Sequence, residues 1–114
     1  MKAMVLSKTG PLTETSVPLE LVDLPTPRPG PGEVRLRVSA CGVCHTELDE
    51  IEGRTAPPTL PVVPGHEVVG WIDCLGEGVS TRRLQDRVGV GWIHSSSGAD
   101  DENLSTRFRA TGRD

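Results

Sequence analysis

The first residues that could do chemistry form the run CGVCH at positions 41–45. Cys-x-x-Cys-His is the attachment sequence of a c-type haem. Cys44 followed by His45 and Thr46 also fits a zinc-bound thiolate whose polar neighbours move protons. The two interpretations require different metals, so the rest of the chain has to decide between them.

A second reactive pair, His66 and Glu67, lies at a Pro-Gly turn directly before an apolar stretch. Cys44 in turn follows a strand-like stretch, so both candidate ligands stand at the ends of predicted strands. A turn that enters a strand fixes the direction of its side chains. We therefore expect the sulfur of Cys44 and the imidazole of His66 to converge on one ion.

The elements that must hold these residues are mostly strands. EVRLRVSA at 33–40 alternates apolar and polar residues, as a half-buried strand does. Further candidate strands are AMVL at 3–6, LELVDL at 19–24, VVGWIDCLG at 68–76 and RVGVGWI at 87–93. CHTELDEIEG at 44–53 is predicted to be a helix that ends at Gly53, because acidic residues early in a helix suit its dipole. The pattern predicts a small β barrel or sandwich.

Size and charge exclude several function classes. A chain of 114 residues forms about one domain and has no room for a second cofactor-binding domain of usual size. Its net charge of -4 makes nucleic acid an unsuitable partner. It has no apolar run of 18 residues and no signal-peptide centre, so we expect a cytoplasmic protein without a membrane partner.

The cysteine and methionine counts favour zinc over haem. Three cysteines in a chain that is not secreted argue against a disulfide framework and leave metal binding or inert burial. A c-type cytochrome is usually exported and helical, and needs a distal ligand such as methionine. The chain has only Met1 and Met4 to offer. The counts therefore argue against haem at 41–45 and leave a zinc-bound thiolate or an inert buried thiol.

Two motifs in this order resemble a known family. GVCHTEL at 42–48, and GHE at 65–67 followed by Gly70, Gly76 and Val79, are similar to the N-terminal GroES-like domain of zinc-dependent alcohol dehydrogenases, in the medium-chain dehydrogenase family. The similarity extends to the opening MKAMVL, the strand PGPGEVRLRV and the segment DRVGV. It implies a mainly β, partly open GroES-like barrel with one or two short helices. Residues 1–94 would form the core, and 95–114 a polar tail at the position of a degenerate structural-zinc lobe.

The resemblance also implies a ligand set. Cys44 and His66 would bind a catalytic zinc that keeps one position open for a substrate oxygen. Glu67 would sit behind the metal as an alternative ligand with a catalytic role. Glu47 would hydrogen-bond the ligand histidine and orient it.

Two further residues acquire roles from the resemblance. Thr46 would accept the proton of the alcohol, and His45 would lie near the pyrophosphate of NAD(P). The zinc would lower the pKa of the alcohol so that hydride can pass to nicotinamide. Structural explanations compete: Thr46 suits a helix N-cap, and His45 a solvated loop.

The chain also departs from the family pattern. In the family a third zinc ligand, a cysteine, lies beyond the equivalent of position 114, and the Rossmann domain for NAD(P) follows it. The 114 residues contain no Gly-x-Gly-x-x-Gly fingerprint. Ser105 stands where a structural-zinc cysteine is expected, and Asp49 where many members have a relay histidine. Cys41 and Cys74 fall at positions that do not bind metal in the family.

The sequence therefore predicts part of an alcohol dehydrogenase. A complete member oxidises an alcohol to an aldehyde or ketone with NAD(P), whereas this chain alone is expected to be truncated and inactive. The alternative is a non-catalytic interaction module that keeps the barrel and at most a weak metal site. Exposed apolar surface would then promote self-association into a homo-oligomer.

Overall fold

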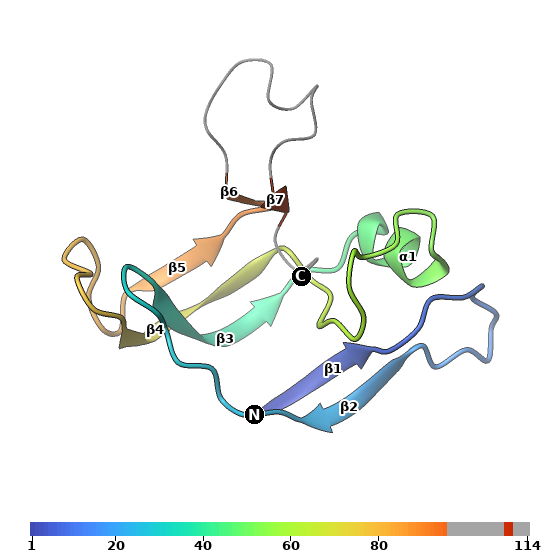
Figure 1. The fold of residues 1–114 in the computed structure, drawn as a ribbon, viewed down its shortest axis with the longest axis horizontal. Helices are drawn as coiled ribbons and strands as arrows, with labels where there is room; N and C mark the ends of the chain where they lie inside the picture. Colours follow the sequence, from blue (N-terminus) through green and yellow to red (C-terminus); the bar gives the residue numbers. More distant parts are fainter. Residues whose placement is uncertain (96–108, 111–114) are drawn as a thin grey trace, which may run out of the picture.

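A computed structural model describes residues 1–95 and 109–110 as a mainly β fold with one helix (Figure 1). Its elements are β1 (Lys2–Leu6), β2 (Leu19–Asp23), β3 (Val34–Cys41), α1 (His45–Glu52), β4 (Val68–Leu75), β5 (Arg87–Val90), β6 (Ile93–Ser95) and β7 (Arg109–Ala110). β1 pairs with β2, β4 lies between β3 and β5, and β6 pairs with β7, all antiparallel. The predicted mainly β class is confirmed, and the sheets within the described residues form an open barrel.

The pairing of β3 with β4 brings the two predicted ligand segments together. Cys41, at the end of β3, pairs with Val68, at the start of β4. The adjoining residues continue this contact, since the N–H of Gly42 donates to the carbonyl oxygen of Glu67 over 2.9 Å. The segments that lead to Cys44 and to His66 therefore leave the same end of the sheet.

A small apolar cluster anchors α1 against β1. Leu6, Ile51 and Val62 are buried together, with Leu12 and Leu19 packed against them. Leu6 and Val62 also exchange two backbone hydrogen bonds of 2.8 and 3.0 Å. These contacts fix the position of the helix that begins beside the predicted metal site.

Gly53 ends α1, as predicted. It adopts the left-handed conformation at φ 82°, and its N–H donates to the carbonyl oxygen of Glu50 over 3.2 Å. Glycine takes this conformation without the clash that a Cβ would cause, which explains why the helix stops here.

At Gly76, backbone hydrogen bonds hold the end of β4 against the proline-rich loop that precedes β3. Its N–H donates to the carbonyl oxygen of Glu33, and the N–H of Gly32 donates to that of Glu77, both over 2.8 Å. A Cβ on Gly76 would collide with the carbonyl oxygen of Gly30 and lie 2.8 Å from that of Glu33. The position therefore requires glycine because backbone, and not a movable side chain, fills the space.

The C-terminal part differs from the expectation at two points. The predicted strand 87–93 is divided into β5 and β6, which belong to different sheets. Residues 109–110, expected to be loop, form β7 and pair with β6. Most of the predicted tail at 95–114, including Ser105, lies outside the described residues, so the proposed domain division stays a prediction.

Within the described part of the chain, no helix is both long enough and apolar enough to span a bilayer.

Candidate metal centre

Cys44 begins α1 and acts as its N-cap. Its backbone is extended, at φ -119° and ψ -173°, and its Sγ accepts a hydrogen bond of 3.3 Å from the N–H of Thr46. In return the N–H of Cys44 donates to Oε2 of Glu47 over 2.8 Å, which completes a capping box. The alternative role of Thr46 as the N-cap is therefore wrong, because Cys44 occupies that position.

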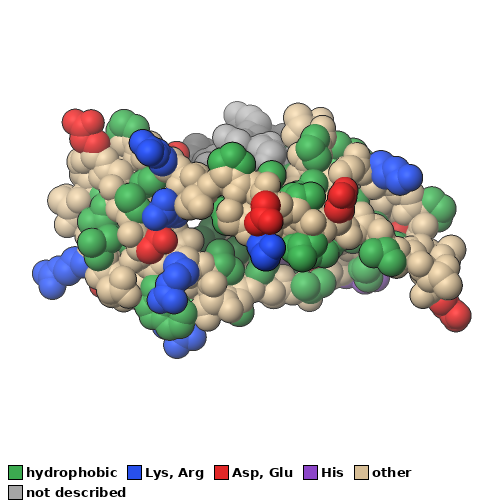
Figure 2. Space-filling view, turned by 90° about the horizontal axis from the view of Figure 1, so that it is seen from below, with side chains coloured by type: hydrophobic (Ala, Val, Ile, Leu, Met, Phe, Trp, Pro, Cys, Tyr) green, Lys and Arg blue, Asp and Glu red, His purple; other side chains and the backbone are tan. Residues whose placement is uncertain are grey.

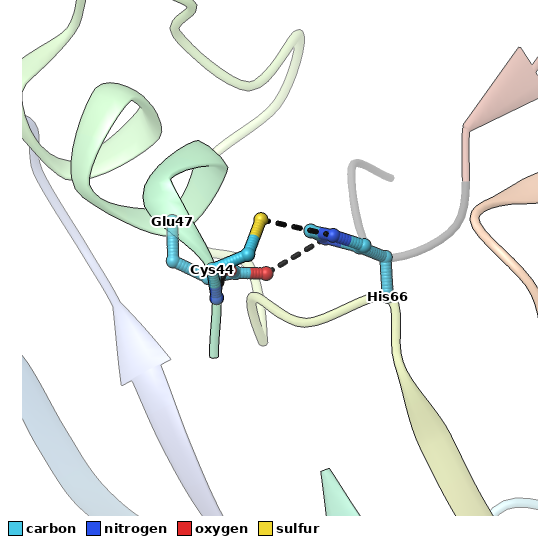
Figure 3. A group of neighbouring side chains, drawn as sticks. All are labelled: Cys44, Glu47 and His66. Carbon is cyan, nitrogen blue, oxygen red and sulfur yellow. Dashed lines mark hydrogen bonds and ion pairs between the residues drawn. The ribbon is translucent and has the colours of Figure 1, made fainter. Parts of the chain in front are cut away.

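His66 meets Cys44 from the other side of the site (Figure 3). Its Nε2 lies 3.3 Å from the Sγ of Cys44, and the residue is only 6% exposed. Zinc binds sulfur at about 2.3 Å and imidazole at about 2.0 Å, so a tetrahedral ion separates such atoms by about 3.5 Å. The observed separation fits two atoms that share one ion.

Glu47 contacts the other ring nitrogen of the same histidine. Its Oε1 lies 2.7 Å from Nδ1 of His66, and both side chains are 8% exposed. This buried oxygen accepts no hydrogen bond of regular geometry within the described residues. A proton on Nδ1 would satisfy it and leave Nε2 as an acceptor for a metal.

The three side chains form a donor set that fits zinc. Single ligand atoms of Cys44, Glu47 and His66 all lie within 4.8 Å of one another. Thiolate and imidazole are the ligands that zinc prefers. Both oxygens of Glu47 already face other groups, Oε2 the helix start and Oε1 the histidine ring. Its geometry therefore favours orientation of His66 over direct ligation.

The other predicted site residues lie around this group without joining it. Thr46 is half-buried in the first turn of α1, next to Cys44. The His45 side chain is 78% exposed, and its Nε2 lies 3.7 Å from Oδ1 of Asp49. Glu67 is exposed, and its carboxylate packs over Gly42, where a Cβ would meet it. The described structure leaves the roles of these three residues as predictions.

Arg54 is a neighbour of the site that no motif in the sequence marked. It pairs with Asp49 and with Glu52, and the hydrogen bonds to Asp49 and then Glu52 raise the pKa of its guanidinium above its usual value. Asp49, where the resemblance implies a relay histidine, thus forms an ion pair with an arginine. Finding this pair from the sequence would have required knowing that Arg54 folds back past Gly53.

An open cavity adjoins the metal centre on the β4–β5 side. It measures about 460 Å³ and is lined by residues 66–69 and 89–92. Val68, Val90 and Trp92 give it a largely apolar wall, while His66 and Glu67 supply its polar groups. Such a cavity suits a small substrate with an apolar body and one polar atom.

Comparison with known proteins decides the family. Residues 30–112 match the alcohol dehydrogenase GroES-like domain. The chain belongs to this family. It is 46% identical over 99 residues to an alcohol dehydrogenase of Moraxella sp. (strain TAE123), covering 86% of this chain and 28% of that protein. It is 44% identical over 89 residues to an alcohol dehydrogenase of Geobacillus stearothermophilus, covering 77% and 26%.

Solved structures of alcohol dehydrogenases share the fold. An NAD-dependent alcohol dehydrogenase aligns with a TM-score of 0.82 at 32% identity, over 99% of this chain and 34% of the other. The cobalt- and zinc-bound thermostable alcohol dehydrogenase from Pyrobaculum aerophilum gives 0.74 at 33% identity, over 92% and 30%. The GroES-like chain described here thus spans about a third or less of these proteins.

The contact between Glu47 and His66 leads to a prediction for the GroES-like domain. Replacing Glu47→Gln should lower the affinity for Co²⁺ about tenfold, because the amide cannot hold His66 with a negative charge. Glutamine still closes a capping box, so the unfolding midpoint should change little. A titration of the cobalt absorption bands and a thermal melt measure the two effects. Equal affinity in both proteins would show that Glu47 does not support the histidine.

Proposed function

We propose that this chain is the zinc-binding catalytic domain of an alcohol dehydrogenase. The observation that carries the proposal is the 3.3 Å approach of Cys44 Sγ to His66 Nε2. The relatives named above are alcohol dehydrogenases, and their solved counterparts include a zinc-bound one. The substrate would be a small alcohol or aldehyde that enters the cavity beside His66.

Cys44 and His66 would hold the ion, and Glu47 would keep the histidine ring in the required orientation. A zinc ion bound there would make the alcohol more acidic and polarise the carbonyl product. Thr46 lies two residues after Cys44. Its hydroxyl would take up the proton of the alcohol. The backbone N–H of Thr46 donates to the sulfur of Cys44, so the residue lies beside the candidate site, which supports this role.

Two more residues complete the proposal. His45 is exposed at the start of α1, where it is accessible to the pyrophosphate of NAD(P). Glu67 follows the ligand histidine and is fixed to Gly42 through its backbone, so it could reach the ion when a substrate leaves. Both roles rest on the matching motif positions and on this placement.

We also propose that the 114 residues alone do not complete the reaction. Hydride transfer needs a bound dinucleotide, and the sequence contains no glycine-rich fingerprint for one. The relatives that do catalyse it are about three times longer or more. The chain would therefore contribute the metal and the substrate cavity.

A cobalt titration tests the proposed function. The chain should bind one Co²⁺ with a sulfur-to-cobalt charge-transfer band, and a short primary alcohol should change the visible spectrum of the complex. Alcohol-dependent reduction of NAD⁺ by the chain should stay at the background rate. A complex without the sulfur band would overturn the metal assignment. Robust turnover would overturn only the expected inactivity of the chain alone.

Exposed apolar side chains favour a second candidate, a non-catalytic interaction module. Val17 is 87% and Val43 79% exposed. Exposed apolar side chains recruit partners or a second copy of the chain where they form one contiguous patch. A chain that binds no Co²⁺ but self-associates with rising concentration in light scattering would support this candidate over the enzyme.

A further inference from the structure

A second cavity lies at the opposite end of β3 from the metal centre. It measures about 280 Å³ and opens between the start of β1, the proline-rich loop and β3. Figure 2 shows a hollow on this face with Lys and Arg side chains on both sides of it. The charged and apolar residues of its lining include Lys2, Pro27, Arg35, Arg37, Val38 and Asp73.

The cations around this cavity differ in how they are paired. Nζ of Lys2 lies 3.3 Å from Oδ2 of Asp23. Nε of Arg35 donates to Oδ1 of Asp73 over 2.8 Å. Asp73 is the acidic residue among those that line the cavity, and Arg35 already neutralises it. Arg37 has no carboxylate partner among the described residues, and the N-terminal ammonium of Met1, which also lines the cavity, donates to the backbone carbonyl oxygen of Leu24. The lining therefore carries uncompensated positive charge in a chain whose net charge is -4.

Trp71 holds the unpaired guanidinium in place. Arg37, Trp71 and Arg87 stand side by side across β3, β4 and β5. The guanidinium carbon of Arg37 lies 5.3 Å from the centre of the indole ring and that of Arg87 lies 5.7 Å from it. A guanidinium that contacts a ring face still has its N–H groups available, since they lie in its own plane. The contact with Trp71 therefore leaves the N–H groups of Arg37 available to a ligand.

The rest of the lining is apolar. Pro27, Leu36 and Val38 contribute to the wall, and Val38 is 59% exposed. A free phosphate ion would use the cation and leave this wall in water. A carboxylate with a short hydrocarbon body would use both, since the arginine fork matches the two carboxylate oxygens.

We propose that this cavity binds a small organic carboxylate through Arg37, with the hydrocarbon body against Pro27 and Val38. The site is separate from the metal centre and does not depend on the proposed function. Its volume lies near the lower limit of ligand cavities, about 300 Å³, so the ligand is small.

Hexanoate is a suitable probe for a calorimetric titration of the metal-free, full 114-residue chain. Binding should occur in the millimolar range, and Arg37→Gln should weaken it at least about tenfold, as loss of a charge-assisted hydrogen bond does. Arg87→Gln is the matched control, because it removes the same charge from the same indole but not from the cavity lining. It should change the affinity less than twofold.

The other arms of the experiment separate the sources of binding. Hexanamide has the same hydrocarbon body without the charge, and inorganic phosphate has charge without the body, so both should bind at least about tenfold more weakly. Thermal melts of both variants check that each is folded. Equal losses in the two variants, equal binding of hexanamide or phosphate, or no binding of hexanoate would overturn the proposal.

Discussion

Replacing Cys44→Ser is expected to lower the affinity of the chain for Co²⁺ or Zn²⁺ by at least about 100-fold. Serine is among the preferred N-cap residues, so α1 should still begin at this position. What disappears is the thiolate, and a hydroxyl is a poor substitute for it towards zinc. The substitution therefore separates the two roles of Cys44, as helix cap and as ligand.

A metal titration followed by optical spectroscopy measures this effect. The sulfur-to-cobalt band should vanish in Cys44→Ser, while the helical circular dichroism signal and the thermal midpoint without metal should stay close to those of the parent. Cys41→Ser is the control, since Cys41 is exposed and lies outside the donor group. Loss of the band in the control, or its persistence in Cys44→Ser, would contradict the assignment.

The largest effect on stability is expected at Gly76. Replacing Gly76→Ala would place a Cβ against the carbonyl oxygens of Gly30 and Glu33, and neither can move without displacing the proline-rich loop. Overpacking of this kind costs about 3 kcal/mol, a large share of the stability of a domain this size. The thermal midpoint should fall by at least about 10 °C.

Gly10→Ala is the matched comparison for this prediction. A Cβ on Gly10 would meet no atom within 4 Å, so its unfolding midpoint should stay within about 2 °C of the parent. If both variants melt like the parent, the contact between the end of β4 and the proline-rich loop does not constrain the fold in solution.

Local patterns in the sequence predicted most of the individual elements. Strand β3 was expected at 33–40 and occupies Val34–Cys41, because alternation of apolar and polar residues is a property of the strand itself. The end of α1 at Gly53 was likewise predicted, since a left-handed cap depends on one residue type. Features that depend on one segment alone could be predicted from the residues of that segment.

Pairings between distant segments could not be inferred in this way. β6 and β7 are short and far apart in the chain, and neither shows alternation. The row of Arg37, Trp71 and Arg87 depends on the register of β3 against β4, which shifts between 35 and 36 and between 38 and 40. Each shift changes which residues stand opposite one another, and no local signal in the sequence marks it.

The candidate metal centre could be predicted from the sequence in part. Cys44, His66 and Glu47 were selected from motifs, and the structure places all three side chains together. The capping role of Cys44 was missed because cysteine is not among the usual N-cap residues. Glu67 was selected with them, but its exposed side chain lies over Gly42 outside this group, and its role stays a prediction.

The Sγ of Cys44 both caps α1 and faces His66. Binding of an ion by this sulfur would therefore be coupled to the stability of the first turn of the helix. Anything that binds the folded site more tightly than the unfolded chain must strengthen the first turn by an equal amount. Protease cleavage within 45–52 should accordingly slow as free zinc rises. The dependence of the cleavage rate on free zinc would then measure the affinity of the site for the metal.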